Sequence, residues 1–277
     1  MSLTRFTTSS IGRKQTMAIT GLLLVGFLVS HLLGNFLIFA GYGDKYKHEQ
    51  AKGLQQLLNK HSNAKQNVPT VNESKKNLAK INALLKSNPN LIESTDNSNI
   101  PLNTYALKLK ELGPLLWIAR LGLIVIFVLH MFMFMQTTLI NKAARPIPYA
   151  TVKDAGGSTT ASKTMVYTGI ILFGYILLHL ADFTFNLFET TSVIDGVDEG
   201  LFGIVVNGFK NPIHTGLYVL AMFILGLHVS HAIQSACQTF GINHPKYNLL
   251  IKNSSNGIGI ALALGYMSIP IFVLIKL

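Results

Sequence analysis

Residues 17–40 read MAITGLLLVGFLVSHLLGNFLIFA, and the uncharged run around them extends from Lys14 to Asp44. About 20 apolar residues are enough to cross the hydrocarbon core of a bilayer as a helix. A charge at the bilayer centre costs at least about 2.5–3.5 kcal/mol, so such long uncharged runs are typical of spans. The run is too long for the apolar part of a signal peptide and has no small-residue cleavage site, so we expect it to remain as a helix.

Four more uncharged runs are long enough to span a membrane. They lie between Arg120 and Lys142, Lys163 and Asp182, Lys210 and Lys246, and Lys252 and Lys276. The sequence therefore predicts an all-α fold, an integral membrane bundle of five transmembrane helices. We place these helices near residues 17–40, 113–139, 165–185, 213–240 and 256–275.

The composition agrees with a membrane protein, because 49% of the residues are hydrophobic and only 13% are charged. The net charge is +11, but no zinc, RNP or helix-turn-helix signature accompanies it, so we expect no nucleic-acid partner. Cys237 is the single cysteine. One cysteine excludes an internal disulfide, a thiolate iron–sulfur site and a C-x-x-C-H haem attachment, so any haem would be held non-covalently.

Basic residues in the short connections predict the orientation of the helices. They precede the first predicted helix and lie between the second and third; they are Arg5, Arg13, Lys14, Lys142, Arg145, Lys153 and Lys163. These ends are expected to face the cytoplasm, which puts the N-terminus inside and the C-terminus outside. Acidic residues dominate the connection between the third and fourth helices, as in an outer loop; they are Asp182, Glu189, Asp195, Asp198 and Glu199.

We treat residues 1–277 as one membrane domain that carries a polar outer insertion at 41–112. This insertion is rich in Lys, Asn and Ser. Leucines near 54–58 and 78–85 have helical spacing, and residues 88–101 resemble a loop. A solvated helical hairpin on the membrane surface is the simpler interpretation, against a specific binding role.

Four of the five predicted helices each carry a histidine near mid-membrane, at His31, His130, His179 and His228. A single intramembrane histidine is often only a packing residue, but four together favour a functional role. The first lies 17 residues beyond Lys14, counted as 31 − 14. We count in the same way from the basic or polar residue at the cytoplasmic end of each helix. At 1.5 Å per residue, the depths of His31, His130, His179 and His228 from the cytoplasmic side are roughly 25, 18, 24 and 20 Å. His31 therefore matches His179, and His130 matches His228.

A local repeat supports the same pairing. The first helix reads Thr20-Gly21-x4-Gly26-x4-His31-Leu32, and the third reads Thr168-Gly169-x4-Gly174-x4-His179-Leu180. Both helices run in the same direction, so a pseudo-twofold axis normal to the bilayer would bring their histidines face to face. The sequence predicts one haem b between His31 and His179 on the outer side, and a second between His130 and His228 on the inner side. Two axial imidazoles suit electron transfer.

Other residues are weaker candidates. His231 is one turn from His228 and is the rival ligand in the fourth helix. His48, His61, His214 and His244 are interpreted as solvated. Haem propionates need cationic or hydroxyl partners, and those near the spans are Arg13, Lys14, Thr20, Arg120, Lys142, Tyr175 and Tyr218. For each of them an interfacial anchor is the simpler interpretation.

The chain resembles the single large membrane subunit of bacterial succinate dehydrogenases and fumarate reductases, a five-helix di-haem cytochrome b. The resemblance covers all five helices. The motifs that carry it are Ser10-Ile11-Gly12-Arg13-Lys14 before His31-Leu32-Leu33-Gly34-Asn35, Gly113-Pro114-Leu115-Leu116-Trp117 before His130, Asn141-Lys142-Ala143-Ala144-Arg145-Pro146, His179-Leu180-Ala181-Asp182-Phe183, and His228-x2-His231-x3-Ser235-Ala236-x-Gln238-Thr239-x-Gly241. With one histidine on each of four helices, the chain departs from the cytochrome b of quinol–cytochrome c oxidoreductases.

The resemblance implies a flavoprotein subunit, where succinate chemistry takes place, and an iron–sulfur subunit, both docked on the cytoplasmic face of a bacterial inner membrane. It implies electron transfer through the two haems to a membrane quinone, with menaquinone the expected species, or the reverse for fumarate reduction. In relatives that use menaquinone, an acidic residue in or after the first outer connection takes part in the quinone site. The insertion at 41–112 interrupts that connection, so Glu111 is only a weak quinone-site candidate.

Two other functions stay open at this point. One is the di-haem cytochrome b anchor of a hydrogenase or formate dehydrogenase, which gene neighbours or a co-purifying flavoprotein would distinguish. The other is a transporter with a histidine proton relay, which should pair its histidines with membrane carboxylates. None of the five uncharged runs contains a carboxylate. The direction of catalysis, the haem potentials and the oligomeric state are left open.

Overall fold

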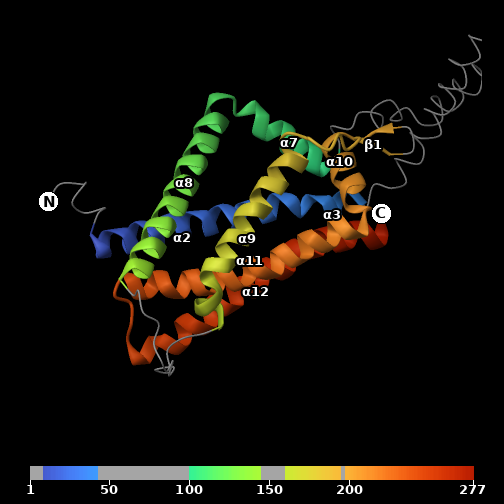
Figure 1. Ribbon diagram of the computed structural model, residues 1–277. Coiled ribbons are helices and arrows are strands. Elements are labelled where there is room, and N and C mark those ends of the chain that lie inside the picture. Colours follow the sequence, from blue (N-terminus) through green and yellow to red (C-terminus); the bar gives the residue numbers. More distant parts are fainter. Residues whose placement is uncertain (1–8, 43–99, 145–159, 195–196) are drawn as a thin grey trace, which may run out of the picture. The chain divides into compact units, whose positions relative to one another are not determined.

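Five helices of the protein are long and apolar enough to cross a membrane. The computed structural model describes residues 9–42, 100–144, 160–194 and 197–277, and most of these residues are helical (Figure 1). The spanning helices are α2 (Ser10–Asn35, continued by the short α3, Leu37–Tyr42), α8 (Pro114–Ala143), α9 (Thr160–Phe183), α11 (Pro212–Thr239) and α12 (Pro245–Lys276). The prediction of five helices with the length and apolar composition of membrane spans is confirmed.

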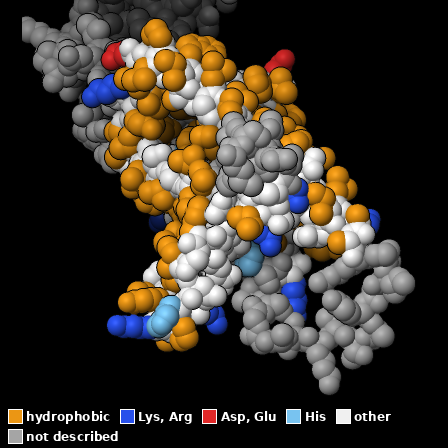
Figure 2. All heavy atoms as spheres, turned by 90° about the vertical axis from the view of Figure 1, so that its left-hand side faces the viewer, with side chains coloured by type: hydrophobic (Ala, Val, Ile, Leu, Met, Phe, Trp, Pro, Cys, Tyr) orange, Lys and Arg blue, Asp and Glu red, His pale blue; other side chains and the backbone are white. Residues whose placement is uncertain are grey.

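Many of the exposed side chains of these helices are large and apolar, and such a surface would be unfavourable in water. On α8 the exposed fractions of Leu121, Ile124 and Val128 are 58%, 57% and 57%, and Met133 is the one buried residue of that helix. Figure 2 shows hydrophobic side chains over most of the described surface in view. A helix that is hydrophobic all round belongs in a protein core or in lipid. Because almost none of the side chains of α8 are buried in the protein, we expect lipid to surround this helix.

The helices are longer than their uncharged runs. At the start of α2 the Ser9 hydroxyl accepts a hydrogen bond from the Gly12 N–H at 2.9 Å, which caps the helix before its first basic residues. Helix α12 begins at Pro245, eleven residues before the predicted 256, since 256 − 245 = 11. Its first three turns carry Lys246 and Lys252, and both are exposed. A search for uncharged runs finds the part of a helix that crosses lipid and misses polar turns beyond it.

The chain divides into two compact units. The first comprises residues 1–33, 113–179 and 213–271. In its described part, α11 contributes the largest buried face, which includes Tyr218, Met222, Leu225 and Val229. Helices α11 and α12 approach closely, because a Cβ added to Gly226 would lie 2.9 Å from the Gly259 carbonyl oxygen. Small residues therefore allow the two backbones to pack against each other.

The second unit comprises residues 34–112, 180–212 and 272–277. Its described elements are α3, the helix α7 (Pro101–Glu111), the helix α10 (Gly200–Phe209), and the two-residue strands β1 (Val193–Ile194) and β2 (Val197–Asp198). The strands pair antiparallel, with Val193 opposite Asp198. Its buried apolar side chains are those of Ile38, Ile100, Leu102, Phe202, Val206, Phe209 and Val273.

A buried amide joins α7 to the start of α10. The Asn103 side chain accepts a hydrogen bond from the Phe202 N–H at 2.9 Å and donates one to the Glu199 carbonyl at 2.9 Å. Gly203 on α10 has no room for a Cβ, because the Ser192 carbonyl oxygen occupies that position. These contacts hold α10 against α7 and against the segment that enters β1.

The polar segment predicted at 41–112 is described only at its two ends. The helical pieces near 54–58 and 78–85, and most of the loop at 88–101, lie outside the described residues. The end of the segment forms α7, which we did not predict. Helix α10 was also not predicted, although it is apolar and follows the acidic residues of the connection between the third and fourth spans.

Candidate functional site

His31 and His179 face each other in the first unit. They come from α2 and α9, the two helices with the repeated sequence, and their ring centres are 5.9 Å apart. The two ring planes are nearly perpendicular, at 82°. The structure therefore brings together the two histidines that the depth count and the repeat pair with each other.

Aromatic rings surround this pair, which the sequence predicts to lie on the outer side and which is called the outer pair below. Phe27 stacks on His31 with ring centres 5.3 Å apart, and the Tyr266 ring lies 6.2 Å from the same imidazole. The Tyr266 hydroxyl donates a hydrogen bond to the Leu28 carbonyl on α2 at 2.7 Å, which fixes that ring. His31 therefore lies in an apolar setting of defined shape.

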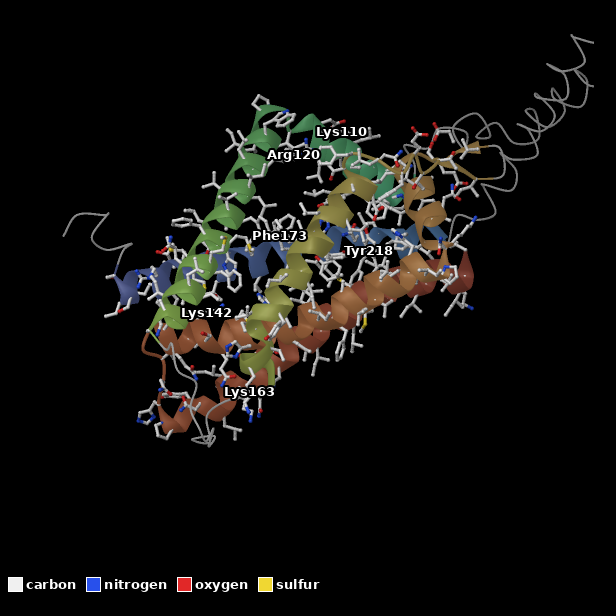
Figure 3. The ribbon with its side chains drawn as sticks, viewed as in Figure 1. Lys110, Arg120, Lys142, Lys163, Phe173 and Tyr218 are labelled. Atoms are coloured by element: carbon white, nitrogen blue, oxygen red, sulfur yellow. The ribbon has the colours of Figure 1, made fainter. Side chains whose placement is uncertain are left out.

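Two tyrosines flank the other imidazole of the pair. Tyr175 stacks on His179 at 5.9 Å, and Tyr218 approaches it from α11 at 6.2 Å. Figure 3 shows Tyr218 on α11, where its ring also contacts Tyr175 at 5.1 Å and His214 at 4.8 Å. Tyr218 is only 3% exposed. It is therefore an interior residue of the first unit and not an interfacial anchor.

The inner histidines are each held by a threonine from a repeat helix. His130 Nδ1 lies 3.1 Å from Thr20 Oγ1, and His228 Nδ1 lies 3.1 Å from Thr168 Oγ1. Both threonines are buried, with exposed fractions of 5% and 6%. The two contacts use equivalent positions of the repeat, so the repeat reaches both pairs of histidines.

The glycine after each threonine provides space for the imidazole. A Cβ on Gly21 would lie 3.3 Å from His130 Cε1, and a Cβ on Gly169 would lie 3.6 Å from His228 Cε1. Because neither glycine carries a Cβ, the imidazole can approach the helix backbone. Thr168 was not among the residues singled out from the sequence, although the Thr-Gly repeat was a signal that could have identified it.

Two polar atoms on α11 and α8 are buried without a hydrogen-bond partner among the described residues. His231 lies three residues beyond His228 on α11, and its Nδ1 is buried with no hydrogen-bond partner. Thr137 Oγ1, seven residues beyond His130 on α8, is also a buried polar atom without a partner.

The spacing of His31 and His179 fits the two axial ligands of one haem. An imidazole nitrogen binds a metal ion at about 2.0 Å and lies roughly 1 Å from its ring centre, so two imidazoles on one iron have ring centres about 6 Å apart. The 5.9 Å between His31 and His179 agrees with this spacing. Buried polar atoms of native proteins normally have partners, and carboxylate groups of a cofactor could supply partners to Thr137 and His231.

A bare metal ion fits less well. Within the described ranges, no group of three or more His, Cys, Asp or Glu side chains is arranged to hold a metal ion. Pairs of histidines need further donors, and a porphyrin provides four nitrogens in its plane. The donor set therefore favours haem over a protein-only metal site.

The remaining predicted residues are separate from these pairs or differently engaged. Thr20 bonds to His130 and to its own helix, so its hydroxyl is already used. The Arg120 guanidinium lies 5.1 Å from the centre of the Trp117 ring, which is a cation–π contact. Lys14 and Lys142 are exposed and Arg13 is half-buried. Glu111 is exposed at the end of α7, in the second unit.

Two further residues complete the picture of the spans. Phe173 on α9 (Figure 3) stacks on Phe127 of α8, with ring centres 6.1 Å apart and planes at 10°. Asp182, which we used as the outer limit of the third run, lies in the last turn of α9 and is only 5% exposed.

No protein-family model, curated protein or solved structure matches the chain.

Proposed function

We propose that this chain is the membrane-anchor cytochrome b subunit of a succinate:quinone oxidoreductase, either a succinate dehydrogenase or a fumarate reductase. It would carry electrons between an iron–sulfur subunit and a membrane quinone. The observation that carries the proposal is the pair His31 and His179, whose ring centres lie 5.9 Å apart on two helices with the same repeated sequence. The second pair, His130 and His228, has equivalent threonine contacts.

The chain's own residues would hold, orient and shield two haem b groups. A haem with two axial imidazoles supplies one-electron transfer and has no open position for oxygen or substrate. Phe27, Tyr175 and Tyr218 pack around the outer pair and would help to shield a haem there from water. Thr20 and Thr168 orient the inner pair.

The charge distribution supports an orientation with the N-terminus on the cytoplasmic side, and the resemblance implies that the membrane is the bacterial cytoplasmic one. Exposed basic residues lie near those ends of the spanning helices that the sequence assigns to the cytoplasm; they are Lys14, Lys142, Lys163, Lys246 and Lys252. A flavoprotein subunit and an iron–sulfur subunit would dock on this side. Succinate chemistry would belong to the flavoprotein, so this chain would act as an electron-transfer subunit of the enzyme.

The quinone would bind near the outer pair, and menaquinone is the expected species. Glu111 remains the weak candidate for this site. It is exposed at the end of α7, where a carboxylate could exchange protons with water.

The haem content of the purified complex tests this function. We expect two protohaem groups per chain, both low-spin, because four imidazoles fill four axial positions. Succinate should reduce them, or fumarate should oxidise them, in a reduced-minus-oxidised spectrum of the complex. One haem per chain, or a high-spin spectrum, would contradict the four-ligand assignment. A di-haem preparation without a flavin-containing partner, inert to both substrates, would favour the hydrogenase or formate dehydrogenase anchor.

A further inference from the structure

The hydroxyl groups of Thr20 and Thr168 have a defined direction of hydrogen bonding. Thr20 Oγ1 donates to the Thr16 carbonyl at 2.9 Å or to the Met17 carbonyl at 3.1 Å, and Thr168 Oγ1 donates to the Met165 carbonyl at 3.0 Å. A hydroxyl has one proton but can accept two hydrogen bonds. Because helix carbonyls cannot donate, each of these contacts with a carbonyl requires the hydroxyl proton.

The 3.1 Å contacts of these threonines with His130 and His228 can run in either direction, because the donor depends on the tautomer of the imidazole. We assign each hydroxyl proton to the carbonyl of its own helix, so that the Nδ1–H of His130 donates to Thr20 and the Nδ1–H of His228 donates to Thr168. A neutral imidazole that carries its proton on Nδ1 has its lone pair on Nε2. Both inner histidines are therefore in the one tautomer that can bind a metal through Nε2.

The spacing of the repeat connects these threonines to the outer pair. In α2 the interval from Thr20 to His31 is 31 − 20 = 11 residues, and in α9 the interval from Thr168 to His179 is 179 − 168 = 11 residues. Eleven residues make about three turns of helix, so the two side chains share a face and lie about 16 Å apart along the axis. Each repeat helix thus presents a histidine at one depth and a hydroxyl at the other.

We propose that Thr20 and Thr168 are positioning residues for the inner haem. Each accepts the Nδ1–H of an axial ligand that comes from another helix, fixes its tautomer and ring orientation, and makes it a stronger electron donor to iron. This inference rests on the proposed function and adds the residues that tune one haem of the two. Hydrogen bonds of this kind raise the basicity of a metal-bound imidazole, which stabilises the oxidised metal. The two helices that clamp the outer haem would therefore set the potential of the inner haem.

Valine and serine variants of the full complex test this role. Thr20→Val and Thr168→Val keep the size of the side chain but remove the acceptor, whereas Thr20→Ser and Thr168→Ser keep the acceptor. Thr239→Val is the matched control, because Thr239 Oγ1 donates to the Ser235 carbonyl of its own helix at 2.8 Å. The readouts are the midpoint potential of each haem by redox titration and the g-values of each low-spin ferric signal.

We expect each valine variant to shift the inner haem to a more positive potential and to change its g-values, while the outer haem is unchanged. The serine variants and Thr239→Val should match the wild type. Loss of the inner haem alone in the valine variants, with recovery in the serine variants, would also support the proposal. An unchanged inner haem, a shift confined to the outer haem, or equal loss of both haems in the valine and serine variants would overturn it. Complete absence of haem from the wild-type complex would instead refute the proposed function.

Discussion

At the scale of single residues, the environment of a ring nitrogen separates His228 from His231. The Nδ1 of His228 lies against a threonine hydroxyl, and the Nδ1 of His231 is buried without a partner. A metal-binding histidine almost always gives its other nitrogen to a fixed acceptor. The Thr168 hydroxyl therefore gives His228 the fixed partner that is typical of a metal-bound imidazole, which favours His228 over His231 as the axial ligand on α11.

Substitution of these two histidines should have different results. We expect His228→Leu to deplete the inner haem and to slow electron entry from the iron–sulfur partner, because one axial ligand is lost. His231→Leu should keep both haems at two per chain. Pyridine haemochrome analysis of the purified complex measures the difference. If His231→Leu removed one haem and His228→Leu did not, the assignment of the ligand on α11 would be wrong.

Gly21 and Gly169 offer a second prediction, because the two sites differ in the space they leave. A Cβ at Gly21 would be 3.3 Å from His130 Cε1, which is tight, whereas the 3.6 Å at Gly169 is an ordinary contact. Gly21→Ala should thus displace the His130 ring by a few tenths of an ångström and change the inner-haem spectrum more than Gly169→Ala does.

Overall stability should not fall in either variant, since alanine is favoured over glycine in a helix by about 0.5–1 kcal/mol. A thermal unfolding curve of each variant in the same detergent is the control. An equal spectral change in both variants, or none in Gly21→Ala, would show that the contact with His130 is looser than the structure has it.

The sequence indicates the candidate ligands more directly than the residues that support them. The charge cost of the bilayer makes His31, His130, His179 and His228 conspicuous, because apolar residues surround them. The contact between Thr168 and His228 depends on how α9 and α11 are rotated and placed beside each other, and a pattern along one helix does not give that rotation. The repeat shows that Thr20 and Thr168 are equivalent, but the hydrogen-bond partner of each becomes evident only in three dimensions.

At the scale of elements, length and polarity decide what a sequence pattern reveals. Five uncharged runs predict five spans because lipid penalises every charge in them. Helix α10 is apolar but has ten residues, too few to span, and its packing on α7 depends on Asn103, which is distant in the sequence. Helix α12 begins within a polar segment, so hydropathy predicts its apolar part and misses its first turns.

The Asn103 amide should account for much of the stability of the α7–α10 packing. Asn103→Leu would leave the Phe202 N–H without this partner in a site that is 4% exposed, whereas the Glu199 carbonyl would still accept the Gly203 N–H. Each buried group left unsatisfied costs about 1–3 kcal/mol, so the free energy of unfolding should fall by that order. Asn207→Leu is the control, because Asn207 bonds to the Thr191 and Val193 carbonyls in an exposed position.

Equilibrium unfolding in detergent measures both variants. Loss of the buried Asn103 amide should lower the free energy of unfolding clearly more than loss of the exposed Asn207 amide. Equal losses would mean that the interior of this unit has water available to replace the amide.

The start of α10 should be sensitive to acid. The Ser192 hydroxyl and the Gly200 N–H, whose nitrogen lies 2.9 Å from Asp198 Oδ1, hold the pKa of the Asp198 carboxyl below its usual value of 3.8. The folded state thus favours the charged form, and the stabilisation is present above the unfolded pKa and is lost as the pH falls through the lower, folded value. A carboxylate at a helix N-terminus also interacts favourably with the helix dipole.

Hydrogen exchange of the Gly200 amide measures this effect. Its protection should be constant from pH 7 down to about 5 and should fall below pH 3.8. In Asp198→Asn the side-chain oxygen still accepts the N–H but does not titrate, so protection should not depend on pH in this range. The same acid dependence in the asparagine variant would assign it to another group.

At the scale of the whole molecule, the repeat gives α2 and α9 two tasks each. The two helices bring His31 to His179 at one depth and place a threonine against each inner histidine at the other. Helices α8 and α11 carry only the proposed inner ligands, His130 and His228. We infer that the inner pair depends on all four helices, whereas the outer pair has its ligands on two.

The pairing itself can be tested by removing ligands one at a time. If His31 and His179 bind one haem, His31→Leu and His179→Leu should each remove the same spectral component, the one nearer the outside, and leave the component of His130 and His228. The double variant should lose little more than either single variant, because effects at one shared site are not additive. Low-temperature difference spectra and redox titration of the purified complex distinguish the two components.

The threonines of α2 and α9 stay in place in these variants, so the inner haem should keep its potential as well as its spectrum. Should His31→Leu and His130→Leu abolish the same component, the pairing by depth and repeat would be wrong, and the 5.9 Å between the outer imidazoles would reflect helix packing alone.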